Sequence, residues 1–484
     1  MGQLCRAYRS HPYHARLHGV RGIPQTTVAG WLGMTQAQVS RIENGPPIRN
    51  LDALVFWATT LRIPESHLWF DLPRRGRGEA AAARSGTTPA EPDPAVVASQ
   101  HEWRQTRRYL NSHRSHLAKA AVRLYQQDAR IGTTPLLSSP TWMPSCPVDL
   151  DDVDLRWASG PQPSTTTGTE IEARTLSPLR TPEYRYDRYT SAIRYVDTPT
   201  LFENRPSYRL LDVQWSGESG SMTFGLSAYF DKLDIAEAIG HEYARAASQS
   251  PTDDRSAPLV AWKDLPFRRL IDPFDLASRP VIPAITTLTL CRSRERATAT
   301  FLLHWRDPAR VATAGGIYDV IPAGEFQPSS ISPWSQTTDL DLWRNIVREY
   351  SEELCGEPEH DGSRGTPVDY DTWPFYRAMN RARDSGRLAA YCLGVGLDAV
   401  TLAATIPTVV VIDDDAFAEI FGEIVDANAE GVTVTFFRGQ GSATGIPFTE
   451  ENVEHLLAEE PMASPGAACL YLAWQHRDRI LDPG

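Results

Sequence analysis

Three glutamates near residue 350 have the spacing of a carboxylate cluster. Glu349, Glu352 and Glu353 stand at i, i+3 and i+4, so a helix through this segment would place all three on one face. They fall in its last turns, where the helix dipole disfavours negative charge, and their grouping costs free energy unless a cation compensates it. Mg²⁺ and Mn²⁺ prefer carboxylate oxygens, and an ion held there could bind a diphosphate and activate a water. We therefore expect a metal site at Glu349, Glu352 and Glu353, with Glu349 and Glu353 as the catalytic candidates.

The residues around this cluster resemble a known motif. The segment REYSEELCG, residues 348–356, resembles the second half of the Nudix hydrolase motif REUxEExGU, where U is a bulky aliphatic residue. The preceding IPAGEFQP, residues 321–328, resembles the glycine-bearing loop that follows a strand in that family. The resemblance implies a Nudix-like α/β/α sandwich over residues 257–484. It also implies that the three glutamates are metal ligands or the catalytic base, and that Arg348 orients them through an ion pair.

The lead-in to this helix departs from the family pattern. The family has a glutamate eight residues before the arginine, where this chain has Leu340. Gly324 lies 24 residues before Arg348, so the intervening loop is longer than in the family. Asp339 and Asp341 are the two candidates to replace the missing acid. The chain thus keeps the glutamate helix but rebuilds the loop that would meet a substrate.

Three interpretations of residues 257–484 follow. The segment is a former Nudix fold that binds a nucleotide-like ligand and reports to the N-terminal region, which is our working interpretation. Alternatively it is a Mg²⁺-dependent Nudix-type pyrophosphohydrolase that cleaves nucleoside diphosphate derivatives. In the third interpretation the glutamates are only the solvated acidic end of a helix in an unrelated α/β domain, and the protein is an interaction module.

A second sequence motif, IPQTTVAGWLGMTQAQVSRIENG, occupies residues 23–45. Pro24 suits the start of a helix, Gly33 supplies a tight turn, and Thr35 is a good N-cap for a second helix. Val39 and Ile42, three residues apart, would bury the inner side of that second helix. Its outward face carries side chains that can bond base edges in the major groove, namely Gln36, Gln38, Arg41 and Asn44.

Residues 1–73, through TQAQVSRIENG, resemble the Cro/phage-repressor (XRE-type) helix-turn-helix family. The resemblance implies an all-α five-helix domain in which Gln25 lies against phosphate and Gln36. It implies that Gln36, Ala37 and Arg41 face bases, that Gln38 and Asn44 hold the DNA backbone, and that Glu43 pairs within the domain. The expected DNA-binding residues are Gln25, Thr35, Gln36, Ala37, Gln38, Arg41 and Asn44. The alternative is a helical domain that docks only on protein.

Charge supports a polyanion partner for the N-terminal region alone. Residues 1–77 carry ten arginines and four acidic residues, a net charge of +6, while the whole chain has −12. The remaining residues therefore carry −18. A basic region on an acidic protein fits binding of double-stranded DNA by that region.

The pattern along the chain predicts a multidomain protein with an all-α head and a mixed α/β remainder. Residues 1–73 form the helix-turn-helix domain, 74–98 a flexible linker rich in Arg, Gly, Ala and Pro, and 99–130 one long amphipathic helix that serves in dimerisation or as a cap. Residues 150–256 are an α/β segment of uncertain assignment, with an exposed loop at 160–180. Strands are predicted at 208–215, 221–230, 284–291, 298–304, 316–321, 388–395, 408–412 and 432–437, and helices at 233–247, 340–355, 371–384, 415–428 and 450–459.

Composition excludes several classes. The six cysteines are scattered without a CxxC pair, which excludes a zinc ribbon and a disulfide-dense scaffold. The N-terminal residues carry no apolar stretch of signal-peptide length, and we find no membrane span, so we expect a cytoplasmic protein. The sequence as a whole predicts a bacterial sequence-specific transcription regulator, acting as a homodimer, with a ligand-sensing C-terminal domain.

Overall fold

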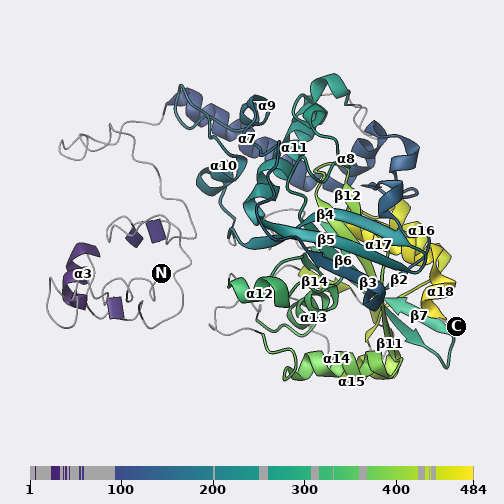
Figure 1. The fold of residues 1–484 in the computed structure, drawn as a ribbon. Helices are drawn as coiled ribbons and strands as arrows, with labels where there is room; N and C mark the ends of the chain where they lie inside the picture. The colour runs from purple at the N-terminus through teal and green to yellow at the C-terminus, as the bar shows by residue number, and fades with distance from the viewer. Residues whose placement is uncertain are drawn as a thin grey trace. The chain divides into compact units, whose positions relative to one another are not determined.

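The structure is a computed structural model of the 484-residue chain (Figure 1). The chain divides into two compact units, Met1–Glu91 and Pro92–Gly484, which we call the head and the body. The residues that the structure describes are 6, 23–32, 36, 39–40, 43, 54–55, 57–58, 93–199, 202–249, 260–306, 316–330, 332–358, 368–422, 431–434, 436–437 and 443–482.

In the head, the first predicted helix of the helix-turn-helix is present as α3, Gln25–Leu32. Pro24 precedes it, as expected of a residue with a fixed φ at a helix start. Val28 on α3 and Val39 in the predicted second helix are both fully buried, together with Trp57. These apolar side chains form the inner side of the head. Of the rest of the predicted five-helix arrangement, the described residues 36, 39–40, 43, 54–55 and 57–58 are helical, and the residues between them lie outside the description.

The mixed α/β character predicted for the body is confirmed. Its helices are α7 Pro94–Ser112, α8 Arg114–Ala121, α9 Ile171–Thr175, α10 Tyr189–Val196, α11 Tyr229–Gln249, α12 Pro333–Thr338, α13 Leu342–Glu353, α14 Pro374–Asp384, α15 Asp414–Phe421, α16 Glu450–Ala458, α17 Ser464–Gln475 and α18 Arg477–Leu481. Short 3₁₀ helices lie at Val122–Leu124, Gln127–Ala129, Pro140–Trp142, Leu150–Asp152, Trp262–Asp264 and Arg268–Leu270. Within the part of the chain that the structure describes, no helix has both the length and the apolar character needed to cross a bilayer.

The strands are β1 Leu136–Leu137, β2 Val148–Asp149, β3 Val153–Trp157, β4 Pro206–Ser216, β5 Ser219–Ala228, β6 Pro283–Ser293, β7 Thr298–Phe301, β8 Leu303–Arg306, β9 Ile317–Val320, β10 Ala323–Glu325, β11 Leu388–Cys392, β12 Gly396–Asp398, β13 Ala404–Asp413, β14 Gly431–Val434, β15 Phe436–Phe437, β16 Ala443–Thr444 and β17 Ile446–Pro447. The largest sheet has the order β1-β12-β13-β6-β7-β17, with β10 also paired to β6 and β11 to β13. Its centre is the parallel pair of β6 and β13, in register from Pro283 opposite Ala404 to Arg292 opposite Asp413. Every residue of β13 is buried, as is usual for a central parallel strand.

Helices cover both faces of this sheet. Helix α17 packs on β6, β9 and β13, whereas α13, α14 and α15 pack on β6, β10, β11 and β13 from the other side. The two-residue period of β13 explains the division: Val409 and Val411 belong to the core under α17, and Val410 and Ile412 to the core that contains Ile346 of α13. The α/β arrangement thus follows from a strand that is apolar on both faces.

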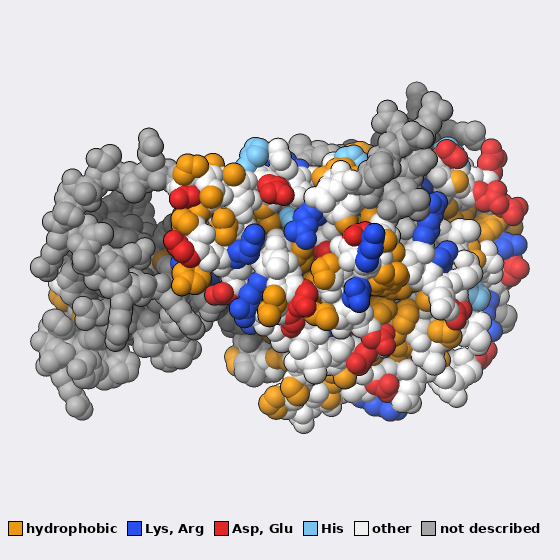
Figure 2. Space-filling model, turned by 90° about the horizontal axis from the view of Figure 1, so that it is seen from above, with side chains coloured by type: hydrophobic (Ala, Val, Ile, Leu, Met, Phe, Trp, Pro, Cys, Tyr) orange, Lys and Arg blue, Asp and Glu red, His pale blue; other side chains and the backbone are white. Residues whose placement is uncertain are grey.

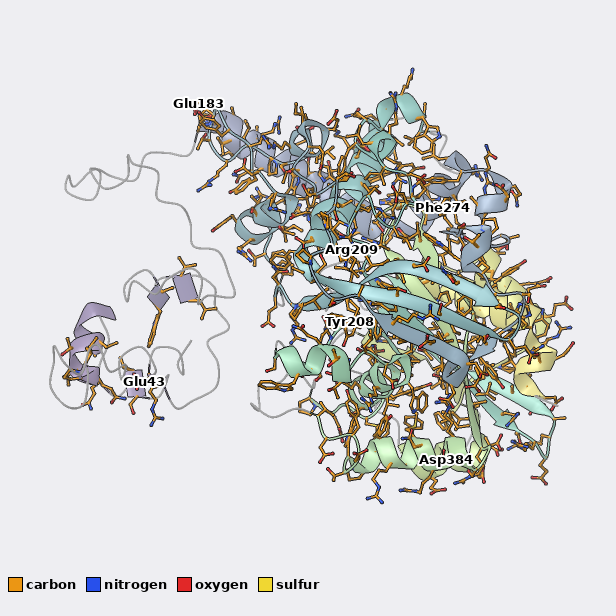
Figure 3. The ribbon with its side chains drawn as sticks, viewed as in Figure 1. Glu43, Glu183, Tyr208, Arg209, Phe274 and Asp384 are labelled. Atoms are coloured by element: carbon orange, nitrogen blue, oxygen red, sulfur yellow. The ribbon has the colours of Figure 1, made fainter. Side chains whose placement is uncertain are left out.

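The body also contains the smaller sheets β3-β5-β4, β14-β8-β9 and β15-β16 and the long helix α11. On β4 the neighbours Tyr208 and Arg209 point in opposite directions, Tyr208 toward α12 and Arg209 toward the carbonyls of Leu276 and Ala277 (Figure 3). One hydrophobic core contains residues from β5 and α11 as well as from α13 and β13. Residues 150–256 therefore share their core with residues 257–484.

Three predicted elements differ from the structure. The helix expected over 99–130 is two helices, because the chain bends at His113 between α7 and α8. Asn111, Ser112 and His113 are all weak helix formers, and the Ser112 hydroxyl donates to the carbonyl of Arg108 at 2.8 Å. Helix α7 also begins at Pro94, inside the predicted linker, since Asp93 accepts hydrogen bonds from the first turn. The exposed loop predicted at 160–180 includes the short helix α9.

Candidate functional site

Helix α13 carries the predicted glutamate cluster, and its presence agrees with the helix predicted there. Asp341 caps its start by accepting a hydrogen bond from the Arg344 backbone N–H at 2.9 Å. The helix ends at Leu354, so Glu349, Glu352 and Glu353 lie in its last two turns and are half-buried. The motif was thus placed correctly on a helix end.

Two of these glutamates face the short strand β10. Glu353 accepts a hydrogen bond from the backbone N–H of Ala323 at 3.1 Å. A Cβ at Gly324 would lie 2.1 Å from the carboxyl carbon of Glu349. No side chain fits at Gly324 unless Glu349 moves, which explains why glycine suits this position. The glycine of the predicted loop and the predicted acidic helix therefore meet in the structure.

Strand β10 has a carboxylate of its own, Glu325, on the face opposite to Glu349. Glu325 forms an ion pair with Lys232 of α11. Consecutive residues of a strand point to opposite faces, so Glu325 points away from the face of Gly324 that meets Glu349. The Oε2 atom of Glu325 is buried and has no hydrogen-bond partner. Neither Glu325 nor Lys232 was identified from the sequence, since their pairing spans two distant elements.

The metal expectation can be tested against this arrangement. Among the described residues, no three or more His, Cys, Asp or Glu side chains are grouped so that they could hold a metal ion. The oxygen donors are of the type that Mg²⁺ or Mn²⁺ takes, but Glu349 and Glu353 are directed at the backbone of β10. In this arrangement the residues do not fit a divalent ion. The metal roles of Glu349, Glu352 and Glu353, and the catalytic roles of Glu349 and Glu353, remain predictions.

Arg348 is buried, and its ion pair shows which of the two candidate acids, Asp339 or Asp341, meets it. Its Nη1 atom lies 3.6 Å from Oδ2 of Asp339, and its Nη2 atom donates to the carbonyl of Gln327 at 2.7 Å and to Oδ1 of Asn345 at 2.8 Å. Asp341 is occupied as the helix cap. Of the two candidate acids, Asp339 is thus the one that pairs with Arg348.

Tyr370 and Ser329 complete this group, which we call the Arg348 network: Arg348, Asp339, Tyr370, Ser329 and Asn345. The Tyr370 hydroxyl accepts from Arg348 and donates to Asp339, each at 2.9 Å, and Ser329 donates its N–H and hydroxyl to the same carboxylate. Burial raises the pKa of the Tyr370 hydroxyl, which keeps it protonated as a donor. Burial alone would lower the pKa of Arg348, but Tyr370, Asp339 and Glu349 raise it. The network fixes the end of the long loop onto α13.

In the head, the described residues place Gln25 against Glu43. The Gln25 Nε2 atom donates to Glu43 Oε2 at 2.8 Å, and Glu43 is only 4% exposed. This contact pairs Glu43 within the domain, as expected, whereas the Gln25 side chain, which was expected against phosphate and Gln36, is bonded to Glu43. Gln36 is exposed. Thr35, Ala37, Gln38, Arg41 and Asn44 lie outside the described residues.

A second buried polar group, which we call the Arg107 network, was missed from the sequence: Arg107, Glu237, Asp197, Tyr189 and His241. Arg107 of α7 donates to Glu237 of α11 at 2.9 Å and lies 3.4 Å from Asp197. The Tyr189 hydroxyl of α10 is 2.9 Å from Nδ1 of His241. Burial, followed by the charges of Arg107 and Arg245, holds the pKa of His241 well below its usual value. Helical periodicity predicts only that these residues lie on the buried faces of their helices. It gives no sign that they bond to one another.

Comparison with known proteins adds no relative: neither a protein-family model nor a curated protein matches the chain. The functional argument therefore rests on the residues of this chain.

Proposed function

We propose that this protein is a sequence-specific DNA-binding transcription regulator whose body binds a nucleotide-like small molecule. The observation that carries the proposal is the contact between Gln25 and Glu43, at 2.8 Å, within the motif of residues 23–45. It joins α3 to the segment predicted as the second helix, and Val28 and Val39 of these two segments are also buried. Gln36, one of the predicted base readers, is exposed. Residues 1–77, which carry a net charge of +6, supply the phosphate attraction.

In vitro selection from random double-stranded DNA tests this proposal with the full chain. We expect enrichment of one sequence, bound most tightly at low salt because phosphate contacts release counterions. Arg41→Ala should weaken binding to that sequence by about 1–3 kcal/mol and relax one base position. Arg74→Ala in the predicted linker is the matched control, and should weaken all sequences about equally. No enrichment, or equal weakening by Arg41→Ala on every sequence, would contradict a reading role.

For the body, a nucleotide-like ligand is proposed because residues 321–328 and 348–356 resemble the two parts of the Nudix motif, while the loop between them is longer than in that family. Binding of ADP-ribose, NAD and nucleoside triphosphates can be measured by calorimetry on the full chain. A nucleotide that binds and changes affinity for the selected DNA supports sensing. Absence of binding across this panel would remove the nucleotide-like ligand from the proposal.

The second candidate function is a Nudix-type pyrophosphohydrolase, and one observation favours it: α13 brings Glu349 and Glu353 to Ala323 and Gly324, the glycine-bearing segment of the motif. The same nucleotide panel with Mg²⁺ or Mn²⁺, read by mass spectrometry, decides. Glu353→Gln is compared with Glu357→Gln, an exposed glutamate just beyond the same helix end. Cleavage that Glu353→Gln abolishes and Glu357→Gln retains would make the body an enzyme.

A further inference from the structure

Exposed apolar side chains gather at one end of the body. Val97, Ile171, Tyr184 and Tyr195 are 47%, 77%, 71% and 49% exposed, and they are four of the seven large apolar side chains that the described residues expose. We call these four residues the α7 patch. They come from α7, α9, α10 and the segment between α9 and α10. Figure 2 shows hydrophobic side chains gathered at this end of the body.

The elements that carry the α7 patch are joined by direct contacts. Ser99 of α7 accepts a hydrogen bond from the Leu179 N–H at 3.0 Å, and Gln100 donates to the Leu179 carbonyl at 3.0 Å. The rings of Tyr186 and Tyr195 stack with centroids 6.1 Å apart. Helices α7, α9 and α10 all pack on α11. The elements that carry the four residues therefore share α11 as a common support.

The support below the patch is rigid. Trp103 of α7 is buried, and its ring lies 5.3 Å from that of Tyr189 on α10. Arg107 links α7 to α11 through Glu237 at 2.9 Å. These buried contacts fix α7 and α10 against α11, so the exposed side chains are presented in a defined arrangement. Exposed apolar side chains held in a fixed arrangement are typical of a protein–protein interface.

We propose that the α7 patch is the surface through which two copies of this chain form a dimer. Exposed charges of both signs lie on the elements that carry it, among them Glu102 and Arg108 of α7 and Glu183 and Arg185 between α9 and α10. Glu183 lies beside the N-terminal end of α7 (Figure 3). A two-fold interface brings a surface against itself, so it needs both signs of charge on the same face. Charges of one sign only would have favoured a partner of the opposite charge over a second copy of this chain.

The position of the linker supports a second copy as the occupant, and this step rests on the proposed DNA-binding function. The head and linker join the body at Asp93, four residues before Val97 in the patch. A dimer through the patch brings two linkers close together. A flexible chain of roughly 20 residues spans about 24 Å, and half-sites on DNA lie about 34 Å apart. Two heads tethered next to one another can therefore reach adjacent half-sites, which one short reading helix needs for useful affinity.

Sedimentation of the full chain tests the proposal. We expect a dimer, and we expect Ile171→Asp combined with Tyr184→Asp to weaken it by about 100-fold or more, since charges would enter an apolar contact. The matched control combines Leu270→Asp and Trp334→Asp, which are 50% and 56% exposed elsewhere on the body. The control should sediment like the wild type. Circular dichroism should show that both variants stay folded, because all four side chains are exposed.

A monomeric wild type, or a dimer that the patch variant leaves intact, overturns the proposal. If the wild type is a monomer and small-angle scattering shows that the patch variant is more extended, the patch is covered by the chain's own head. The DNA selection on the same preparation separates this outcome from the proposed function. If the protein is a monomer and enriches one DNA sequence, the proposed regulator function stands and the dimer proposal fails. If the protein is a dimer and enriches no sequence, the DNA-binding function fails.

Discussion

Arg107 and Arg348 are both buried, at 3% and 7% exposure, but they are held by different numbers of carboxylates. Arg107 lies within ion-pair distance of both Glu237 and Asp197. Arg348 has its ion pair with the buried Asp339, its hydrogen bonds go to neutral groups, and the half-buried Glu349 is a weaker second negative charge. A buried charge that loses its ion-pair partner is far more costly than one that keeps a second partner within ion-pair distance. The two networks should therefore respond differently to the loss of one acid.

The difference also concerns function, because each arginine anchors a helix that carries a candidate surface. The Arg107 network holds α7 and α10 against α11, and these two helices bear Val97 and Tyr195 of the α7 patch. The Arg348 network holds the rebuilt loop against α13, which bears the glutamates. Weakening each network in turn distinguishes the parts of the body that serve assembly from those that serve ligand binding.

The largest expected effect is that of Asp339→Ala. Removing this carboxylate leaves the buried Arg348 with neutral hydrogen-bond partners and only the weaker charge of the half-buried Glu349, and should lower the free energy of unfolding by about 3–5 kcal/mol. Urea unfolding of the full chain, followed by tryptophan fluorescence, measures it. Asp154→Ala, which removes an exposed ion pair with Arg156, is the control and should cost about 0.5 kcal/mol or less. A loss near that of the control would mean that Asp339 is not the counter-charge of Arg348.

Glu237→Ala should cost less, about 2 kcal/mol, because Arg107 keeps Asp197 and the Tyr189 hydroxyl. The same urea experiment applies. Asp197→Ala serves as the comparison within the network: Asp197 is 46% exposed, so its loss should cost no more than about 1 kcal/mol. If Glu237→Ala proved as costly as Asp339→Ala, the second carboxylate would be contributing nothing and the comparison would fail.

The third effect depends on pH and belongs to the Arg107 network alone. His241 has a lowered pKa in the folded body, so the unfolded chain binds its proton first as the pH falls. Its neutral form thus stabilises the fold above about pH 6.5, and that stability is lost below it by up to about 1.4 kcal/mol per pH unit. Unfolding at pH 7.5 and 5.5 should show a steeper loss for the wild type than for His241→Gln. Equal slopes would show that His241 does not remain neutral in the folded body.

The smallest effect is that of Asp341→Ala, which removes the side-chain cap of α13 but leaves the Arg348 network in place. A lost N-cap should cost about 1 kcal/mol. Asp339 and Asp341 are two residues apart, so the pair tests roles assigned within one short segment. A cost for Asp341→Ala that matches Asp339→Ala would reverse the assignment of counter-charge and cap.

Much of the local structure could be predicted from the sequence. The strand expected at 208–215 is β4, the helix at 340–355 is α13, and the acidic segment does end that helix. These succeed because periodicity and capping are properties of neighbouring residues. The long helix over 99–130 was wrong at His113, since three weak helix formers in succession outweighed the continuing apolar pattern. Helix α17 was not predicted, because it is apolar nearly all round and shows no amphipathic period.

By itself, the sequence determined the mixed α/β body, the position of the glutamates on one helix, and the buried pairing expected of Glu43 in the head. Only the tertiary structure decided that Asp339 rather than Asp341 meets Arg348, that Glu325 and Glu349 lie on opposite faces of β10, and that the elements carrying the α7 patch share α11 as a support. The physical reason is distance along the chain. Spacing fixes which residues share a helix face, but contacts between α11 and β10, or between α7 and α10, exist only once the core has brought those elements together.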